Sequence, residues 1–111
     1  MQQKDIVQET ANRMKKKYNL TVGHADVYIA EGIVYLSTQK LAQVFKTGYT
    51  NFTSRYAKPI VQSGVKHARL GKHKYYELEG CLSISSMAID QGKCILEVCE
   101  DMKKKNKKRK K

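Results

Sequence analysis

The segment 65–78 constrains the fold more than any other part of the chain. Polar and apolar residues alternate in 65–70 and again in 74–78, on either side of a glycine-containing turn at 71–73. An alternation with a period of two places successive side chains on opposite faces of a β-strand. The segment therefore predicts a β-hairpin with basic residues at its tip.

Two helical segments precede this hairpin. Apolar residues at helical spacing predict a short helix over 38–46, which ends near Gly48. A second helix is expected to begin at 50–51. We expect Pro59 to kink this helix or to end it near 57–58, because the proline ring displaces a backbone hydrogen bond.

The flanking segments predict further elements. Apolar residues three and four apart indicate a helix over 3–18, and β-branched and aromatic residues indicate a strand, a turn and a strand over 26–36. Residues 80–102 are compatible with a terminal helix or with a final strand that leads into a helix. No internal repeat is apparent in the sequence.

These elements indicate an α+β fold with an N-terminal helix, a short β-hairpin and a C-terminal extension. We expect a single domain over 1–102 with its core in 33–80. The remaining segment, 103–111, holds eight basic residues and one asparagine. Such a run buries no face and its charges repel, so we expect a disordered Lys-rich tail.

The net charge of +12 is unevenly distributed. Residues 37–78 carry a net +7 and residues 103–111 a net +8, whereas the segment 79–102 between them carries a net −4. A dense positive surface on a small domain attracts polyanions. We interpret the first region as a folded cationic surface and the second as a tail that adds phosphate affinity without sequence choice. A simple solubility tail is the alternative.

The sequence contains no apolar run of about 18 residues, and its polar N-terminus lacks the apolar stretch of a secretory signal. Its three cysteines are an odd number late in the chain and do not form a disulfide framework. A reducing compartment fits this usage. We therefore expect a cytoplasmic, nucleoid-associated protein that does not bind membranes.

Three parts of 36–84 are shared with a known family. They are the Leu-Ser-Thr-Gln-Lys-Leu-Ala opening of the first helix, Gly64 between helix and hairpin, and the Arg-Leu-Gly-Lys-His-Lys-Tyr-Tyr hairpin. They resemble the small winged-helix module of phage and transposon excisionases, which MerR-type regulators and some phage terminase small subunits share. The resemblance covers under half of the chain. It implies a winged helix-turn-helix whose second helix enters the major groove and whose hairpin, the wing, touches the backbone or the minor groove.

The candidate site residues follow from these positions. On the second helix, polar and basic side chains are expected to face DNA: Thr50, Asn51, Thr53, Ser54, Arg55 and Lys58. In the wing, the candidates are Lys66, His67, Arg69, Lys72, His73 and Lys74. Non-specific phosphate contacts are expected from Lys40, Lys46, Lys107, Lys108 and Arg109. For Arg55, the alternative is a solvated surface arginine.

Four aromatic residues lie between these candidates. The spacing of Phe52 and Tyr56 indicates that both belong to the core. Tyr75 and Tyr76 are neighbours on one strand and should point to opposite faces. We expect one of them in the core and the other near a sugar or a phosphate.

No motif indicates catalysis. The sequence shows no paired nucleophile and base, no Gly-rich phosphate loop and no carboxylate pair within the basic region. The spacing of His67, His73 and Cys81 matches no common zinc site. We therefore expect no enzymatic activity, no cofactor, no metal and no small-molecule substrate.

The sequence thus predicts a sequence-specific double-stranded DNA-binding protein. The resemblance implies a small regulator of a phage, plasmid or other mobile element, acting in transcription, excision or partition. We expect a homodimer, because one small module rarely supplies enough specificity. One alternative is a phage DNA-packaging adaptor similar to terminase small subunits. Another is an RNA-binding or ribosome-associated protein, for which a Lys-rich tail is equally apt.

Overall fold

The computed structural model describes residues 3–109, with side chains described for 5–105. Its helices are α1 (Gln3–Tyr18), α2 (Thr38–Val44), α3 (Tyr49–Asn51), α4 (Ala57–Gln62), α5 (Leu78–Gln91) and α6 (Ile95–Arg109), with a 3₁₀ turn η1 (His24–Asp26) and a π-helical turn η2 (Phe52–Tyr56). Its strands are β1 (Val27–Ala30), β2 (Ile33–Ser37), β3 (His67–Leu70) and β4 (His73–Glu77). The expected α+β class is confirmed.

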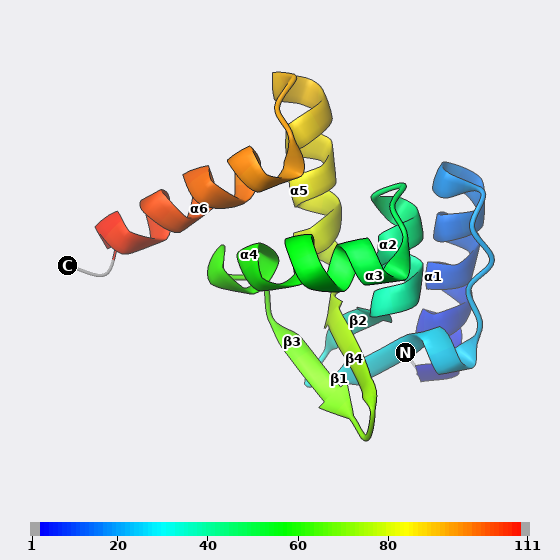
Figure 1. Cartoon of the computed structure of the whole chain (residues 1–111). Coiled ribbons are helices and arrows are strands. Elements are labelled where there is room, and N and C mark those ends of the chain that lie inside the picture. Colours follow the sequence, from blue (N-terminus) through cyan, green and yellow to red (C-terminus); the bar gives the residue numbers. More distant parts are fainter. Residues whose placement is uncertain (1–2, 110–111) are drawn as a thin grey trace.

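The strands form one antiparallel sheet in the order β1-β2-β4-β3. Helix α2 follows β2 directly, α5 follows β4 directly, and both rise from the same side of the sheet (Figure 1). The core lies between these helices and the central strands, where Leu36 and Tyr76 are buried as cross-strand neighbours. The expected hairpin of 65–78 is thus present, but it is only half of the sheet.

The sheet contains an internal repeat that was not expected from the sequence. Each residue of the first hairpin has a counterpart 40 positions later: Val27 pairs with Leu36, and His67 pairs with Tyr76. The pairing between the hairpins obeys the same rule, because Leu36 lies opposite Tyr76 itself. A pseudo-twofold axis therefore passes through this central pair.

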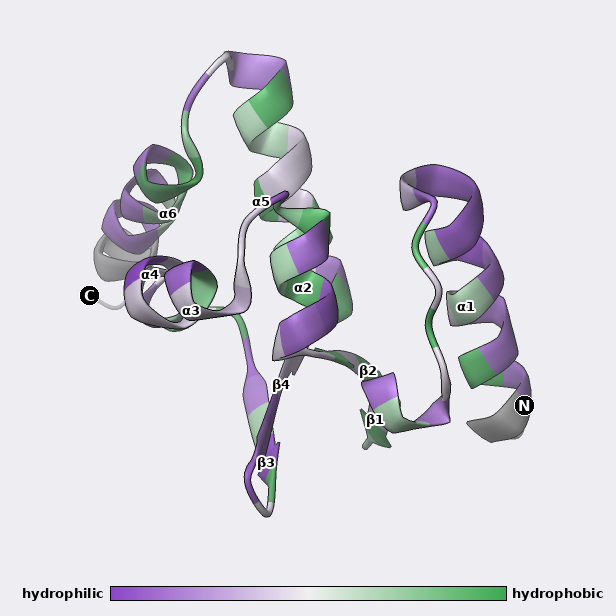
Figure 2. Ribbon diagram, turned by 45° about the vertical axis from the view of Figure 1, so that its right-hand side comes forward, coloured by the Kyte–Doolittle hydropathy of each residue, from purple (hydrophilic) through white to green (hydrophobic). Residues whose placement is uncertain are grey.

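The helices follow the same symmetry. Helices α2 and α5 lie at the centre, flanked by α1 on one side and by α3 and α4 on the other (Figure 2). The two units also share one burial pattern from 35 to 44 and from 75 to 84, in which Leu41 and Cys81 are fully buried counterparts. Each unit is a helix, a β-hairpin and a second helix. The repeat is thus one of structure, and it is not apparent in the sequence.

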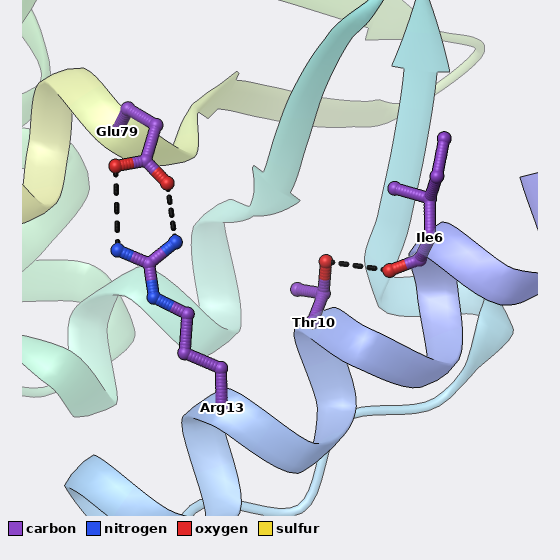
Figure 3. Close-up of polar contacts among 4 residues, drawn as sticks. All are labelled: Ile6, Thr10, Arg13 and Glu79. Carbon is purple, nitrogen blue, oxygen red and sulfur yellow. Dashed lines mark hydrogen bonds and ion pairs between the residues drawn. The ribbon is translucent and has the colours of Figure 1, made fainter. Parts of the chain in front are cut away.

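Helix α1 spans the expected residues and is fixed to the start of α5. The guanidinium of Arg13 donates to both carboxylate oxygens of Glu79 (Figure 3). Met14 is fully buried beside this ion pair. The hydroxyl of Thr10 donates to the carbonyl of Ile6 at 2.8 Å, so this buried polar group is satisfied within the helix (Figure 3).

The second helix does not end at Pro59. Helix α3, the turn η2 and helix α4 form one continuous coil to Gln62 (Figure 1). In η2 the backbone N–H of Ala57 donates to the carbonyl of Phe52, five residues earlier. This wider turn, just before Pro59, gives the ring the room that a regular α-helical turn would deny it. The expected end near 57–58 was therefore wrong.

The C-terminal region is helical where it is described, apart from a short loop over 92–94. Within 80–102, this loop separates α5 from α6 and begins at Gly92, a residue in the left-handed conformation with φ of 63°. Helix α6 continues through the Lys-rich segment to Arg109. The expectation of a disordered tail is thus corrected for 103–109, and 110–111 lie outside the described residues.

The tail is helical for three physical reasons. Lysine is a good helix former, and basic residues near a helix C-terminus interact favourably with the helix dipole. Acidic residues one turn earlier also offset the repulsion, since Lys104 and Lys105 contribute to lowering the pKa of Asp101, after the larger effect of its hydrogen bond with Lys93.

Candidate nucleic-acid interface

The long helix of α3, η2 and α4 presents a polar outer face. Among the residues expected to face DNA, Thr50, Thr53, Ser54, Arg55 and Lys58 are exposed. Asn51 is half-buried, and its side-chain amide donates to the hydroxyl of Thr47. The structure therefore brings five of the six together on an accessible face and holds the sixth against the preceding turn.

The opposite face of this helix is anchored in the core. Phe52 is fully buried, and its ring stacks on Phe45 at 5.6 Å and meets the edge of Tyr76 at 6.0 Å. Tyr56 is half-buried and completes the aromatic cluster at 6.2 Å from Phe52. The core assignment of Phe52 is confirmed, and these contacts fix which side of the helix faces outward.

Two hydroxyls on the outer face are already hydrogen-bonded within the helix. Thr53 and Ser54 both donate to the carbonyl of Thr50, at 3.0 and 2.9 Å. Their oxygens remain free to accept hydrogen bonds. Arg55 and Lys58 are accordingly the strongest donors that this face offers.

The second hairpin carries exposed cations on the face that adjoins the long helix. Arg69 lies directly opposite Lys74 in the β3–β4 register, and His67 lies opposite Tyr76. Side chains paired in this way lie on one face. Because Tyr76 packs on Phe52, this is the face that the helix covers. Arg69 and Lys74 thus lie on the side of the sheet that the helix covers, and Lys74 lines a cleft together with Tyr49 at the start of the helix.

The remaining wing candidates are also exposed. Lys66, Lys72 and His73 surround the hairpin base and tip. The tip itself is tightened by Arg69, whose Nε donates to the carbonyl of Gly71 at 3.0 Å. This contact uses one guanidinium donor and leaves the others free.

The structure corrects the expectation for the two tyrosines of β4. They point to opposite faces, but both are buried. The hydroxyl of Tyr75 donates to the carbonyl of Ala25 at 2.9 Å, and its ring lies 5.9 Å from that of Tyr28. Tyr75 therefore belongs to an aromatic cluster on the far face of the sheet and does not reach a sugar or a phosphate.

The internal repeat supplies a comparison for the cationic hairpin, in which the first hairpin is half-buried at the positions where the second is exposed. The counterparts of His67, Arg69 and Lys74 in the first hairpin are Val27, Ile29 and Val34. The same backbone is thus formed once with apolar residues and once with basic ones. The cations of β3 and β4 are therefore not required for the hairpin to form.

Within residues 5–105, these cations have no carboxylate at ion-pair distance. In the described part of the chain the ion pairs are Arg13–Glu79 and Lys93–Asp101. Neither includes a residue of the long helix or of the second hairpin. We term the combined surface the helix–hairpin surface; it holds Arg55, Lys58, Lys66, Arg69, Lys72 and Lys74.

A cleft of about 520 Å³ separates the hairpin from the start of the long helix. Tyr49 lines it, together with Thr38, His73 and Lys74. Tyr49 is 56% exposed and was not among the expected site residues. The signal in the sequence was its place directly after Gly48, at the N-terminus of the helix expected to bind DNA.

The residues expected to make non-specific phosphate contacts differ in their exposure. Lys46 is exposed, with a left-handed backbone at φ 56° just after α2. Lys40 is half-buried in the first turn of α2, where its backbone N–H donates to the hydroxyl of Ser37. Lys107, Lys108 and Arg109 lie outside the residues whose side chains are described.

Within the described residues, no three His, Cys, Asp or Glu side chains gather as a metal site would need. Burial raises the pKa of the Cys81 thiol above its usual range and raises that of Cys99 to about 11, so both thiols are protonated at neutral pH. No helix in the same part of the chain is long and apolar enough to cross a bilayer.

Comparisons of this chain with protein-family models, with curated proteins and with solved structures find no match.

Proposed function

We propose that the chain is a sequence-specific double-stranded DNA-binding protein that acts through a winged helix-turn-helix. In this proposal the helix over α3, η2 and α4 is the recognition helix, and the β3–β4 hairpin is the wing. The recognition helix enters the major groove, and the wing binds the adjacent backbone or minor groove.

The order of the elements supports this proposal. Over the segment from β2 to β4, the chain forms a strand, the helix α2, the long helix from α3 to α4, and the β3–β4 hairpin. Strand β2 pairs with β4 and so extends the hairpin into the sheet. Helix α1 precedes this segment. Such a scaffold holds a helix and a hairpin on one surface, as simultaneous binding of a groove and the neighbouring phosphates requires.

The observation that carries the proposal is the contrast between the two hairpins. Exposed like charges lie directly opposite each other at Arg69 and Lys74, an arrangement that disfavours strand pairing. The equivalent positions of the first hairpin, Ile29 and Val34, lack this penalty. A polyanionic partner explains why one hairpin carries the penalty and the other does not.

By its resemblance, we further propose that the protein regulates a mobile element and binds DNA as a homodimer. A recognition helix with few base-contacting side chains reads few base pairs, and two copies double the site. Mass measurement of the protein with and without DNA tests this part, since a ring of many copies would indicate a packaging adaptor instead.

The test of the main proposal is selection of binding sites from random duplex DNA, followed by affinity measurements on the selected and on a scrambled site at several salt concentrations. We expect tighter binding to the selected site, and an Arg55→Ala variant that loses much of this preference. Equal affinity for both sites, with a steep salt dependence, would leave only a non-specific binder. Preference for structured RNA over duplex DNA would refute the DNA assignment.

A further inference from the structure

Helix α6 is firmly attached to the body of the protein. Val98 and Cys99 are each only 2% exposed in its first half, where the helix packs on α4 and α5. The ion pair between Lys93 and Asp101, at 2.7 Å, joins the preceding loop to the middle of the helix. The direction of α6 is therefore set by packing and not by a flexible linker.

This helix lies next to the proposed recognition helix. Figures 1 and 2 both show α6 beside α4, on the side opposite to the β3–β4 hairpin. A hollow of about 190 Å³ lies between them and is lined by Arg55 from one helix and by Lys103 and Glu100 from the other. Lys103 is thus the first cation of α6 beside the helix–hairpin surface.

The charges of α6 are sorted along its length. Its acidic residues, Glu97, Glu100 and Asp101, all lie in the first half, and six cations lie between 103 and 109. In Figure 1 the second half extends past the end of α4. Seven residues of α-helix span about 10 Å, so these cations share a short length of helix at high charge density.

We propose that α6 is a third DNA-binding element, which binds phosphate groups flanking the site on the side of the recognition helix opposite to the wing. This inference rests on the proposed function and deepens it. A helix with a fixed direction places its cations at a defined distance from the recognition helix. A flexible tail of the same composition binds any phosphate within reach.

The experiment that distinguishes a helix of fixed direction from a flexible tail keeps every charge and removes only the fixed direction of the second half of α6. A run of four glycines inserted between Met102 and Lys103 uncouples the cations from the packed half of α6, since glycine is a poor helix former. The matched control carries the same glycines after Lys111. Both variants and the wild type are measured by fluorescence anisotropy on random-sequence duplex DNA over a range of salt concentrations.

We expect the internal insertion to weaken binding several-fold and to lower the salt slope by about 0.9 for each phosphate that the protein no longer binds. The control should bind as the wild type does. A second variant, Lys103→Gln/Lys104→Gln/Lys105→Gln, should lower the slope with little change in the thermal unfolding temperature, because Lys104 and Lys105 are exposed, Lys103 is half-buried, and the packing of α6 rests on Val98 and Cys99.

Two results would overturn the inference. Wild-type affinity and slope in the internal-insertion variant would show that the cations act as a flexible arm. An unchanged slope in the triple variant would show that the cations of α6 at 103–105 do not contact DNA. In either case, the proposed function still stands if the wild type binds duplex DNA and Arg55→Ala weakens that binding. A wild type that does not bind duplex DNA would refute both the proposed function and this inference.

Discussion

The internal repeat suggests a substitution that removes charge from the second hairpin and replaces it with residues already present at the equivalent positions of the first hairpin. The double variant Arg69→Ile/Lys74→Val gives β3 and β4 the residues that β1 and β2 carry at the equivalent positions, Ile29 and Val34. Both substituted residues are β-branched and favour strands. The variant should therefore fold, and it should gain up to about 1 kcal/mol because two like charges no longer face each other.

The same variant, although more stable, is expected to bind DNA more weakly. Each phosphate bound by a cation contributes about 0.9 to the slope of log affinity against log salt concentration, so removing both cations lowers the slope by about 1.8. Urea unfolding measures the stability, and fluorescence anisotropy on duplex DNA measures the slope. The matched control, Lys15→Gln/Lys16→Gln, removes two exposed cations from α1, on the other side of the molecule (Figure 2).

The reasoning would be refuted by either of two results. Equal decreases of the slope in the hairpin variant and in the α1 control would show that only the net charge matters. A marked decrease of stability in the hairpin variant would show that Arg69 and Lys74 support the fold, contrary to the comparison of the two hairpins.

Three further predictions concern the fold. Phe52→Ala should destabilise the protein by about 3–5 kcal/mol, because Phe52 is fully buried, whereas Thr53→Ala should change the free energy of unfolding by less than about 0.5 kcal/mol; urea unfolding measures both. The hydrogen bond from Arg13 lowers the pKa of Glu79. At neutral pH the wild type should therefore be more stable than the Glu79→Gln variant, by under about 1 kcal/mol because the pair is exposed. That advantage should vanish as the pH falls through the lowered pKa, and an advantage that persists in acid would contradict it. A water-soluble thiol reagent should modify Cys94 rapidly and the two buried thiols only after unfolding, as followed by mass spectrometry.

Periodicity predicted much of the local structure. Helix α1 was expected over 3–18 and spans those residues, and the strand–turn–strand of 26–36 became β1 and β2. The expected hairpin became β3 and β4. Each of these elements has one apolar face, and such a face appears in the sequence as a regular spacing of apolar residues.

Other features leave no such imprint. The repeat is hidden in the sequence because, over 27–44 and 67–84, Tyr35 and Tyr75 are the only identical counterparts. Symmetry is preserved in the strand register and, over 35–44 and 75–84, in the burial pattern, although the residues themselves differ. The continuation through Pro59 depends on a wider turn that no local pattern indicates. The helical tail depends on acidic neighbours one turn earlier and on packing at Val98.

The sequence predicted most of the exposed cations of the candidate site, but not the contacts that the folded chain makes around them. Most of the expected cations are exposed, because like charges at high density have no place in a core. Tyr49 was missed, and the expectation that one of Tyr75 and Tyr76 lies near a sugar or a phosphate was wrong, since the places of these residues depend on contacts with distant segments. The cleft beside Tyr49 and the bond from Tyr75 to Ala25 exist only in the folded chain.

The central claim is that duplex DNA binds to the helix–hairpin surface. The most direct test is the mapping of backbone amide chemical-shift changes when a selected duplex is titrated into isotope-labelled protein. We expect the largest changes in 50–58 and 66–74, with few in α1, β1 and β2. Changes concentrated in α1 and the first hairpin, or spread evenly over all exposed lysines, would contradict the account.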